Sequence, residues 1–309
     1  KEFKEYFQEK KIVTFQNSET TDNIIDLVFN KKRADDRKVW LGHYDRELYL
    51  DTNKEQVSFD DFINQEFIHF SKYDCDRSIP NLMDGLKTSQ RKILYAAFKK
   101  NLTKEIKVAQ FSGYVSENAA YHHGEASLNG AIVNMAQDYV GSNNINMFNP
   151  NGQFGTRLTG GNDSASERYI YTELNDLTRM LFMKEDDYIL DTLYDDGQAV
   201  EPIYYAPIIP MILVNGAKGI GTGFSTDIMC YNPLDIVAYL KNKLLHESEN
   251  VDINVYYEGY KGDIIALSDT KYLIKGVYNK IDQNTIQVTE LPIGSWTTNY
   301  KEYLESFKN

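Results

Sequence analysis

Apolar side chains recur at helical spacing in the first 70 residues of the chain, with polar residues between them. This pattern predicts a helix over residues 1–10 and a longer one from Thr21 to about His43. Residues 53–57 lack the pattern and are expected to form a loop. Ser58 then resembles an N-cap, and a core-facing amphipathic helix should follow it. The apolar positions of that helix are Phe59, Phe62, Ile63, Phe67 and Phe70.

Three short helical patterns follow Pro80. The residue before a proline is pushed out of the α region, so residues 77–80 are expected to be extended. The predicted helices start at a cap on Thr88 or Ser89, at Val108 (ending near Ser116) and at Glu125 (ending near Val140). Three short helices, one of them basic, fit a helix-turn-helix or winged-helix DNA-binding domain. Periodicity alone does not distinguish that domain from any small helical bundle.

Turn-forming and β-forming residues dominate the rest of the chain. Asn and Gly between Val140 and Asp163 predict a loop, and a group of prolines places a domain boundary near residue 205. Asn232 followed by Pro233 predicts the start of a capped helix, and residues 251–291 have a strand-like pattern. The elements expected near the C-terminus are strands at 271–278 and 285–291, a turn at 282–284 between them, and a helix at 300–307.

The overall charge and the local charge of the chain point to different partners. The 309 residues carry a formal net charge of −12, which by itself argues against a partner rich in phosphate. Between Asp84 and Gln110, however, the cations are opposed only by Asp84 and Glu105. These cations are Lys87, Arg91, Lys92, Lys99, Lys100, Lys104 and Lys107. An acidic protein can therefore contain one strongly basic element, and the alternative is a solvated helix face.

Other features of the composition restrict the class of protein. The two cysteines, Cys75 and Cys230, are too few for a disulfide framework or a zinc site, which favours a reducing compartment. There is no apolar run long enough for a membrane helix and no apolar signal core at the N-terminus. Position 1 is not Met, so we expect a fragment of a longer polypeptide; the alternative is a processed or incompletely recorded N-terminus.

The most informative sequence is Arg168-Tyr169-Ile-Tyr-Thr-Glu-Leu174, which follows Gln153–Arg157 and Gly160–Ser166. These motifs closely resemble the active-site region of the eukaryotic-type DNA topoisomerase II family, which is of type IIA. The resemblance covers nearly the whole chain. The other matching motifs, in chain order, are Asp36–Trp40, Arg77–Lys87, Gln90–Lys92, Lys107–Gln110, Tyr121–Glu125, Val140–Asn144, Tyr194–Asp196 and Ile208–Met211.

The resemblance implies an α+β fold, in which a winged-helix DNA-binding domain of the helix-turn-helix type precedes an α/β tower (shoulder) domain. Residues 1–70 would be a helical linker after an absent TOPRIM domain. Residues 71–205 would be the winged-helix domain with the catalytic tyrosine, and residues 206–309 the N-terminal part of the tower. The implied activity is transient double-strand cleavage through a 5′-phosphotyrosyl linkage. In the full enzyme, cleavage allows duplex passage, relaxation and decatenation.

By this resemblance Tyr169 is the nucleophile. A phenol has a pKa near 10 and needs an activating neighbour at neutral pH. The planar guanidinium of Arg168 can hold a phosphate through paired hydrogen bonds and stabilise the charge of the transition state. Among 23 tyrosines, Tyr171 is the nearest rival, and we expect it to pack.

The resemblance also assigns cationic and proton-transferring neighbours. The adjacent histidines lack the i, i+4 spacing of a zinc protease motif. His122 is expected to relay a proton and His123 to hold a phosphate; the alternative is one helix-capping and one surface histidine. Arg91 would be a further catalytic cation at the scissile phosphate. The remaining DNA-binding residues would be Lys87, Lys92, Arg77 and Lys107, which position the backbone without reading sequence.

The glycine-rich run Gly216–Gly223 does not have the spacing of a phosphate-binding loop. An Ile between glycines instead resembles the apolar wedges that minor-groove proteins insert between base steps. The family match gives Ile220 this intercalating role, and a plain structural turn is the alternative.

The resemblance implies partners and cofactors outside this chain. Mg²⁺ would be bound by the TOPRIM domain and ATP by an ATPase domain, and no metal site is expected here because the acidic pairs read as turns and helix starts. The expected partners are double-stranded DNA, a second protomer in a homodimer, and the TOPRIM and ATPase domains, with no membrane. The expected location is the nucleus, or the cytoplasm for a viral enzyme. A DNA-binding module without covalent chemistry, and an interaction domain, are the competing hypotheses.

Overall fold

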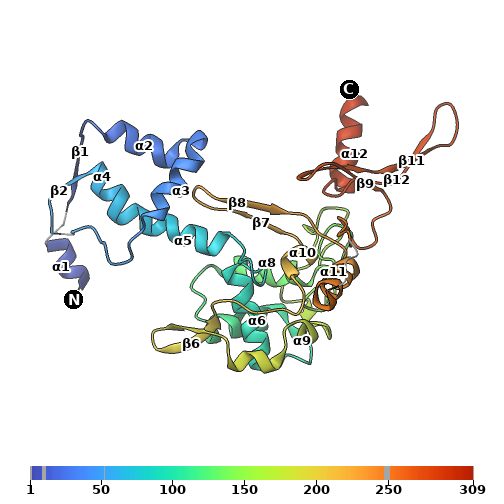
Figure 1. The fold of residues 1–309 in the computed structure, drawn as a ribbon, viewed down its shortest axis with the longest axis horizontal. Coiled ribbons are helices and arrows are strands. Elements are labelled where there is room, and N and C mark those ends of the chain that lie inside the picture. Colours follow the sequence, from blue (N-terminus) through green and yellow to red (C-terminus); the bar gives the residue numbers. More distant parts are fainter. Residues whose placement is uncertain (1, 9–11, 52, 247–250, 309) are drawn as a thin grey trace. The chain divides into compact units, whose positions relative to one another are not determined.

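The computed structural model describes residues 2–8, 12–51, 53–246 and 251–308. The chain divides into two compact units, whose elements are drawn in Figure 1. The first unit comprises Lys1–Ile79 together with Lys218–Thr226, and the second comprises Pro80–Ala217 and Asp227–Asn309. Within the described ranges, no helix is both long enough and apolar enough to cross a bilayer.

The first unit is mainly helical, with one short parallel pair of strands that joins residues 14–16 to residues 56–58. Ser58 caps the next helix as predicted, because its hydroxyl accepts a hydrogen bond from Asp61 N at 3.0 Å. The prediction of a loop over residues 53–57 is wrong at its last two residues, because strand β2 begins at Gln56. The elements are α1 (Glu2–Gln8), β1 (Thr14–Gln16), α2 (Thr21–Phe29), α3 (Ala34–Gly42), β2 (Gln56–Ser58), α4 (Phe59–Phe62), a π-helical turn (Ile63–Phe67) and α5 (Ile68–Ser78).

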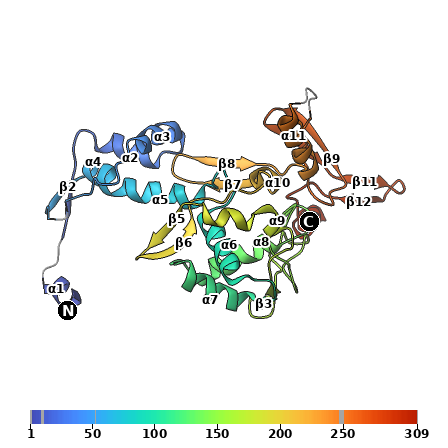
Figure 2. The same cartoon turned by 60° about the horizontal axis from the view of Figure 1, so that its bottom comes forward.

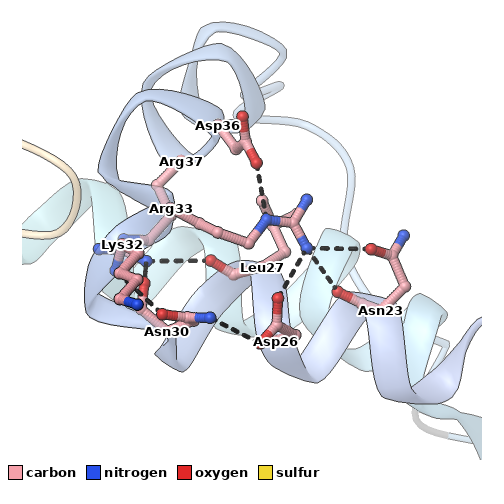
Figure 3. Close-up of polar contacts among 8 residues, drawn as sticks. All are labelled: Asn23, Asp26, Leu27, Asn30, Lys32, Arg33, Asp36 and Arg37. Carbon is pink, nitrogen blue, oxygen red and sulfur yellow. Dashed lines mark hydrogen bonds and ion pairs between the residues drawn. The ribbon is translucent and has the colours of Figure 1, made fainter.

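The helix predicted from Thr21 to His43 is broken at Asn30, which has extended backbone angles. The Asn30 side chain accepts a hydrogen bond from Lys32 N at 2.9 Å and so starts a 3₁₀ turn at Lys31–Arg33. Arg37 donates to the carbonyls of Leu27 at 3.0 Å and Asn30 at 2.6 Å (Figure 3). These bonds satisfy carbonyls that the end of α2 leaves without helical partners. Local side chains therefore favour two helices over one.

The second unit contains a bundle of α6, α7 and α8 (Figure 2), whose fully buried residues include Ile93, Phe111 and Ile132. Helix α6 begins at Thr88 with Lys87 as its N-cap residue, so the predicted cap is wrong by one position. Helix α8 ends at Ala136 and not near Val140. The elements are α6 (Thr88–Lys100), β3 (Ile106–Lys107), α7 (Val108–Asn118), α8 (Glu125–Ala136) and β4 (Tyr171–Thr172).

Short strands and helices continue the second unit after β4. The β7–β8 hairpin lies at the sequence boundary between the units, and its tip, Lys218–Thr226, belongs to the first. Asn232 caps α11 as predicted, accepting from Leu234 N at 2.9 Å. The elements are α9 (Thr178–Leu181), a 3₁₀ turn (Lys184–Tyr188), β5 (Thr192–Asp195), β6 (Gln198–Pro202), α10 (Met211–Val214), β7 (Ala217–Ile220), β8 (Ser225–Ile228) and α11 (Pro233–Leu245).

The strand predicted at 271–278 is two strands with different partners. Strand β10 pairs with β9, whereas β11 pairs with β12. Gly276 lies at the switch, and a Cβ atom there would overlap the carbonyl of Glu290. The elements are β9 (Asp263–Ser268), β10 (Lys271–Lys275), β11 (Val277–Lys280), β12 (Ile286–Glu290), α12 (Thr297–Glu305) and a 3₁₀ turn (Ser306–Lys308). The mixture of helices and small sheets confirms the predicted α+β class; the winged-helix assignment stays a prediction.

Candidate active site

Tyr169 lies in a turn immediately before β4, and its backbone N–H donates to Ser166 O at 2.9 Å. Its side chain is 71% exposed, whereas the next residue, Ile170, is 1% exposed and belongs to the core. Two places further, Thr172 is fully buried. The buried residues anchor the strand, and the phenol is consequently held at the surface.

The start of α7 fastens both sides of this turn. Val108 N donates to Ile170 O at 3.0 Å, and Ala109 N donates to Glu167 O at 3.1 Å. The first N–H groups of a helix have no partner within the helix, and here two of them bind the residues that flank Arg168 and Tyr169. The backbone at Arg168 and Tyr169 is therefore tied to the start of a helix.

Tyr171 is held differently from Tyr169. Its backbone pairs with Lys107 on one side and Asn151 on the other. Its half-buried ring lies 5.9 Å from the Lys107 ammonium. This agrees with the packing role expected for Tyr171 and leaves Tyr169 as the exposed phenol of the pair.

Arg168 is exposed and lines a groove of about 690 Å³ between α8 and residues 161–168. Glu125, the first residue of α8, lines the same groove. The Oδ1 atom of Asn129, also in the lining, is buried without a hydrogen-bond partner. Arg168 thus faces a polar depression formed by the start of a helix of the bundle.

The two predicted histidines, His122 and His123, occupy the link between α7 and α8, and both are exposed. His122 Nε2 lies 3.1 Å from Asp195 Oδ2, on β5. The ring of His123 packs edge-on against Tyr121 at 5.4 Å. Asp195 and Asp196 form one of the acidic pairs that were expected to be turns or helix starts, so the contact of Asp195 with His122 was missed. Tyr194–Asp196 among the family motifs was the only sequence signal for it.

Arg91 and Lys92 do not lie free on the surface of α6. The Arg91 guanidinium donates to the fully buried Asp84 carboxylate through Nε at 2.7 Å and Nη2 at 3.0 Å. Lys92 Nζ donates to Glu201 Oε2 at 2.8 Å and to Ala119 O at 2.6 Å. Two of the cations expected to contact phosphate thus have carboxylate partners in the core.

The other predicted cations have their own surroundings. Lys87 and Lys107 are half-buried, at the starts of α6 and α7. Arg77 belongs to the first unit, where its guanidinium lies 3.8 Å from Asp74 Oδ1 and 5.7 Å from the Tyr73 ring centroid.

Ile220 ends β7 and is 77% exposed. The turn after it rests on the helices of the first unit: Thr222 O accepts from Cys75 Sγ at 3.3 Å, and Thr222 Oγ1 donates to Asp74 Oδ2 at 3.3 Å. Gly221 lies so close to α5 that an added Cβ would be 3.1 Å from the Cα and Sγ atoms of Cys75. The hairpin tip is therefore seated, while the Ile side chain points to solvent.

The tyrosine loop, defined as residues 153–169, is stiffened by Asp163. Its carboxylate accepts hydrogen bonds from Thr156 N at 2.7 Å, Thr156 Oγ1 at 2.6 Å and Thr159 Oγ1 at 2.6 Å. These donors, the Thr156 hydroxyl first, lower the pKa of Asp163 to about 2. Ala165 N donates to Gln153 O at 2.8 Å and closes the base of the loop.

In the described part of the chain, no three His, Cys, Asp or Glu side chains gather into a group that could hold a metal ion. The residues present therefore do not fit the Mg²⁺ that the family implies, and no step is assigned to it here. Cys75 and Cys230 are both buried, and burial raises the pKa of the Cys230 thiol to about 12. Neither thiol is a ready nucleophile.

Comparisons with known proteins agree with the motifs. The family model of the DNA gyrase/topoisomerase IV A subunit matches residues 77–309, and that of the C-terminal associated domain of TOPRIM matches residues 1–75. DNA topoisomerase 2 of Arabidopsis thaliana is 51% identical over 315 residues, covering 99% of this chain and 21% of that protein. DNA topoisomerase 2 of Saccharomyces cerevisiae is 48% identical over 306 residues, covering 98% of this chain and 21% of that protein.

A solved structure is similar over the whole chain. It is the crystal structure of the Plasmodium falciparum topoisomerase II DNA-binding, cleavage and re-ligation domain, with a TM-score of 0.85 and 48% identity. The match covers 100% of this chain and 42% of that one. The chain spans about a fifth of the length of the curated relatives it matches. The comparisons confirm the resemblance that the sequence motifs indicate.

Proposed function

The chain belongs to the DNA gyrase/topoisomerase IV A-subunit family, and on that premise we propose that it is the DNA-binding and cleavage region of a type IIA DNA topoisomerase. The observation that carries the proposal is that Tyr169 and Arg168, adjacent in sequence, are both exposed on a turn whose flanks are bound by the start of α7. A phenol at the surface can reach a phosphodiester that a buried phenol cannot.

The reaction follows from these groups. Tyr169 Oη attacks a backbone phosphorus; the new P–O bond joins the 5′-phosphate to the protein, and the bond to the 3′ oxygen breaks. The phenolic proton passes to a base and the leaving 3′ oxygen acquires a proton, so attack by the 3′ hydroxyl restores the duplex. Arg168 holds the non-bridging oxygens, where negative charge develops. One phosphoester bond forms for each one that breaks, so the energy of the broken linkage is kept in the new bond and the step is reversible.

His122 is the proposed proton relay and His123 a phosphate ligand. The Asp195 carboxylate 3.1 Å from His122 Nε2 can hold that ring in one orientation, as carboxylates do for catalytic imidazoles. Arg91 is proposed as a further cation at the phosphate. The described hydrogen bonds to Asp84 and Leu86 use three of its five N–H donors, so two remain for a phosphate oxygen.

DNA is held and bent by residues outside the reacting pair. Lys87, Lys92, Arg77 and Lys107 are proposed to position the phosphate backbone; Lys92 would have to leave Glu201 to do so. Ile220, exposed at the end of β7, is proposed to insert between base steps. Insertion of an apolar wedge kinks the duplex, which brings more of its backbone onto the protein.

The full enzyme is proposed to pass one duplex through the break and to work as a homodimer in the nucleus. It would use Mg²⁺ held by its TOPRIM domain and ATP held by its ATPase domain. Within this chain, residues 71–205 are proposed as the winged-helix domain and 206–309 as the first part of the tower. Residues 1–70 are proposed as the connection to TOPRIM, which the match of residues 1–75 to a TOPRIM-associated domain supports.

A covalent labelling experiment tests the proposed chemistry. The full enzyme is incubated with an end-labelled duplex and Mg²⁺, denatured, and examined for label that stays on the protein. Tyr169→Phe should abolish the labelled adduct, and the matched control Tyr171→Phe should retain it. Adduct in Tyr169→Phe would refute the assignment. Salt-sensitive binding without adduct in the unmodified enzyme would favour a non-covalent DNA-binding module.

A further inference from the structure

The tyrosine loop is supported by a second segment that is far away in sequence. We define this docking segment as residues 290–298, from the end of β12 into α12. Thr298 N donates to Leu158 O at 2.9 Å, which joins the two segments through their backbones. Both segments belong to the second unit.

Trp296 packs against the backbone of the tyrosine loop. Gly160 has a φ of +66°, and a Cβ atom built on it would overlap the Cε2 and Nε1 atoms of the indole. The other ring of the indole faces Gly141, where a Cβ would be 3.5 Å away. The phenol ring of Tyr139 meets the indole edge-on at 5.9 Å. The indole therefore lies directly on the backbone of the tyrosine loop, in space that a side chain at position 160 would enter.

A buried ion pair fixes the other end of the docking segment. Arg157 forms an ion pair with Glu290, whose side chain is only 4% exposed. Arg157 Nη2 also donates to Leu291 O at 2.7 Å. Glu290 Oε2 accepts from Lys261 N at 3.1 Å, which holds the carboxylate in place. Removal of one partner of such a pair leaves an uncompensated buried charge.

These contacts reach the reactive pair through short, bonded steps. Gly161, next to Gly160, donates to Thr156 O at 2.9 Å. Asp163 then ties Thr156 to Thr159. Further along the chain, the backbone hydrogen bond from Ala165 N to Gln153 O is followed by the turn that ends at Tyr169. With β4 holding the other side of the turn, the position of Arg168 and Tyr169 depends on where the loop is seated.

We propose that Trp296 and Arg157 are positioning residues for the cleavage reaction: the docking segment seats the tyrosine loop and so sets the attack geometry of Tyr169. This rests on the proposed function of Tyr169. Neither positioning residue touches DNA in the proposal. A misplacement of about 1 Å by a residue remote from the reacting atoms can cost on the order of 10²-fold in rate.

The test measures the single-turnover cleavage rate and the DNA dissociation constant of the full enzyme. Trp296→Ala should cleave about 10²-fold more slowly with an unchanged dissociation constant, and Trp296→Phe should recover part of the rate. The matched control Tyr278→Ala removes a 67% exposed aromatic of the neighbouring hairpin and should cleave normally. A cleavage rate of Trp296→Ala equal to that of the unmodified enzyme, or a loss explained entirely by weaker binding, would overturn the positioning role.

A double-mutant cycle keeps the test decisive if one variant is poorly folded. Gly160→Ala should slow cleavage because its methyl group overlaps the indole. In Gly160→Ala/Trp296→Ala that overlap is gone, so the losses should not multiply. Losses that multiply would show independent effects and contradict the proposal. Tyr169→Phe separates the two claims: adduct in that variant would overturn the nucleophile, whereas its absence together with normal Trp296→Ala rates would overturn only the positioning role.

Discussion

Replacement of Asp84 by Asn should destabilise the second unit strongly without changing its shape. The carboxylate is fully buried and accepts hydrogen bonds from Arg91 Nε at 2.7 Å and from Tyr205 N at 3.0 Å on one oxygen, Oδ2. Its other oxygen accepts from Arg91 Nη2 at 3.0 Å and Leu86 N at 2.9 Å. The Asn side chain has an NH₂ group in place of one carboxylate oxygen. The two donors that bind that oxygen would then face another donor, and the Arg91 charge would stay buried without a counter-charge.

Breaking a buried ion pair costs about 3–5 kcal/mol. For a unit of this size, each kcal/mol of lost stability lowers the melting temperature by about 2–4 °C. The melting temperature of Asp84→Asn should therefore fall by roughly 6–20 °C. The assay is thermal and urea unfolding of Asp84→Asn beside the unmodified protein. Asp35→Asn is the control, because the Asp35–Lys38 pair is largely exposed and such pairs contribute little. A loss for Asp84→Asn no larger than that of the control would refute the role of the buried pair.

Three further predictions concern the hairpin, the thiol and the histidine. Gly221→Val should reduce DNA bending, measured by energy transfer between end labels, because its side chain would press on α5; Gly42→Ala, with no atom within 4 Å, should not. Cys230, whose pKa is raised to about 12, should react slowly with thiol reagents at pH 8. The stability that this protonated thiol contributes should be complete below pH ~8.5 and lost as the pH rises through 12. Unfolding measured across alkaline pH would show this loss. Rapid modification of Cys230 in the folded protein would contradict the raised pKa. Asp195→Asn should slow single-turnover cleavage roughly tenfold, since His122 loses its orienting carboxylate; an unchanged rate would exclude that role.

Features set by neighbouring residues could be predicted from the sequence. The caps at Ser58 and Asn232 are side-chain contacts with residues three and two places away. The helix predicted over 108–116 is present as α7, because its apolar stripe is both its local signal and its core face. The mixed fold class, by contrast, was implied by the resemblance of the motifs to a known family.

Features set by contacts distant in sequence could not be predicted. Lys92 finds Glu201 109 residues away, and His122 finds Asp195 73 residues away. A charge pattern on one helix does not reveal such partners, so Lys92 was expected at the surface. The strands on either side of Gly276 pair with different partners, and Trp296 packs on Gly160. Both features depend on backbone segments that are distant in sequence and meet only in the folded chain.

Residue-level identification of the covalent adduct tests the central claim most directly. The full enzyme is trapped on a duplex with Mg²⁺, the complex is digested with protease and nuclease, and the modified peptide is sequenced by mass spectrometry. The proposed chemistry predicts a nucleotide attached through its 5′-phosphate to Tyr169, the 71% exposed phenol next to Arg168. A nucleotide on Tyr171 or any other residue, or a 3′-phosphate linkage, would contradict it.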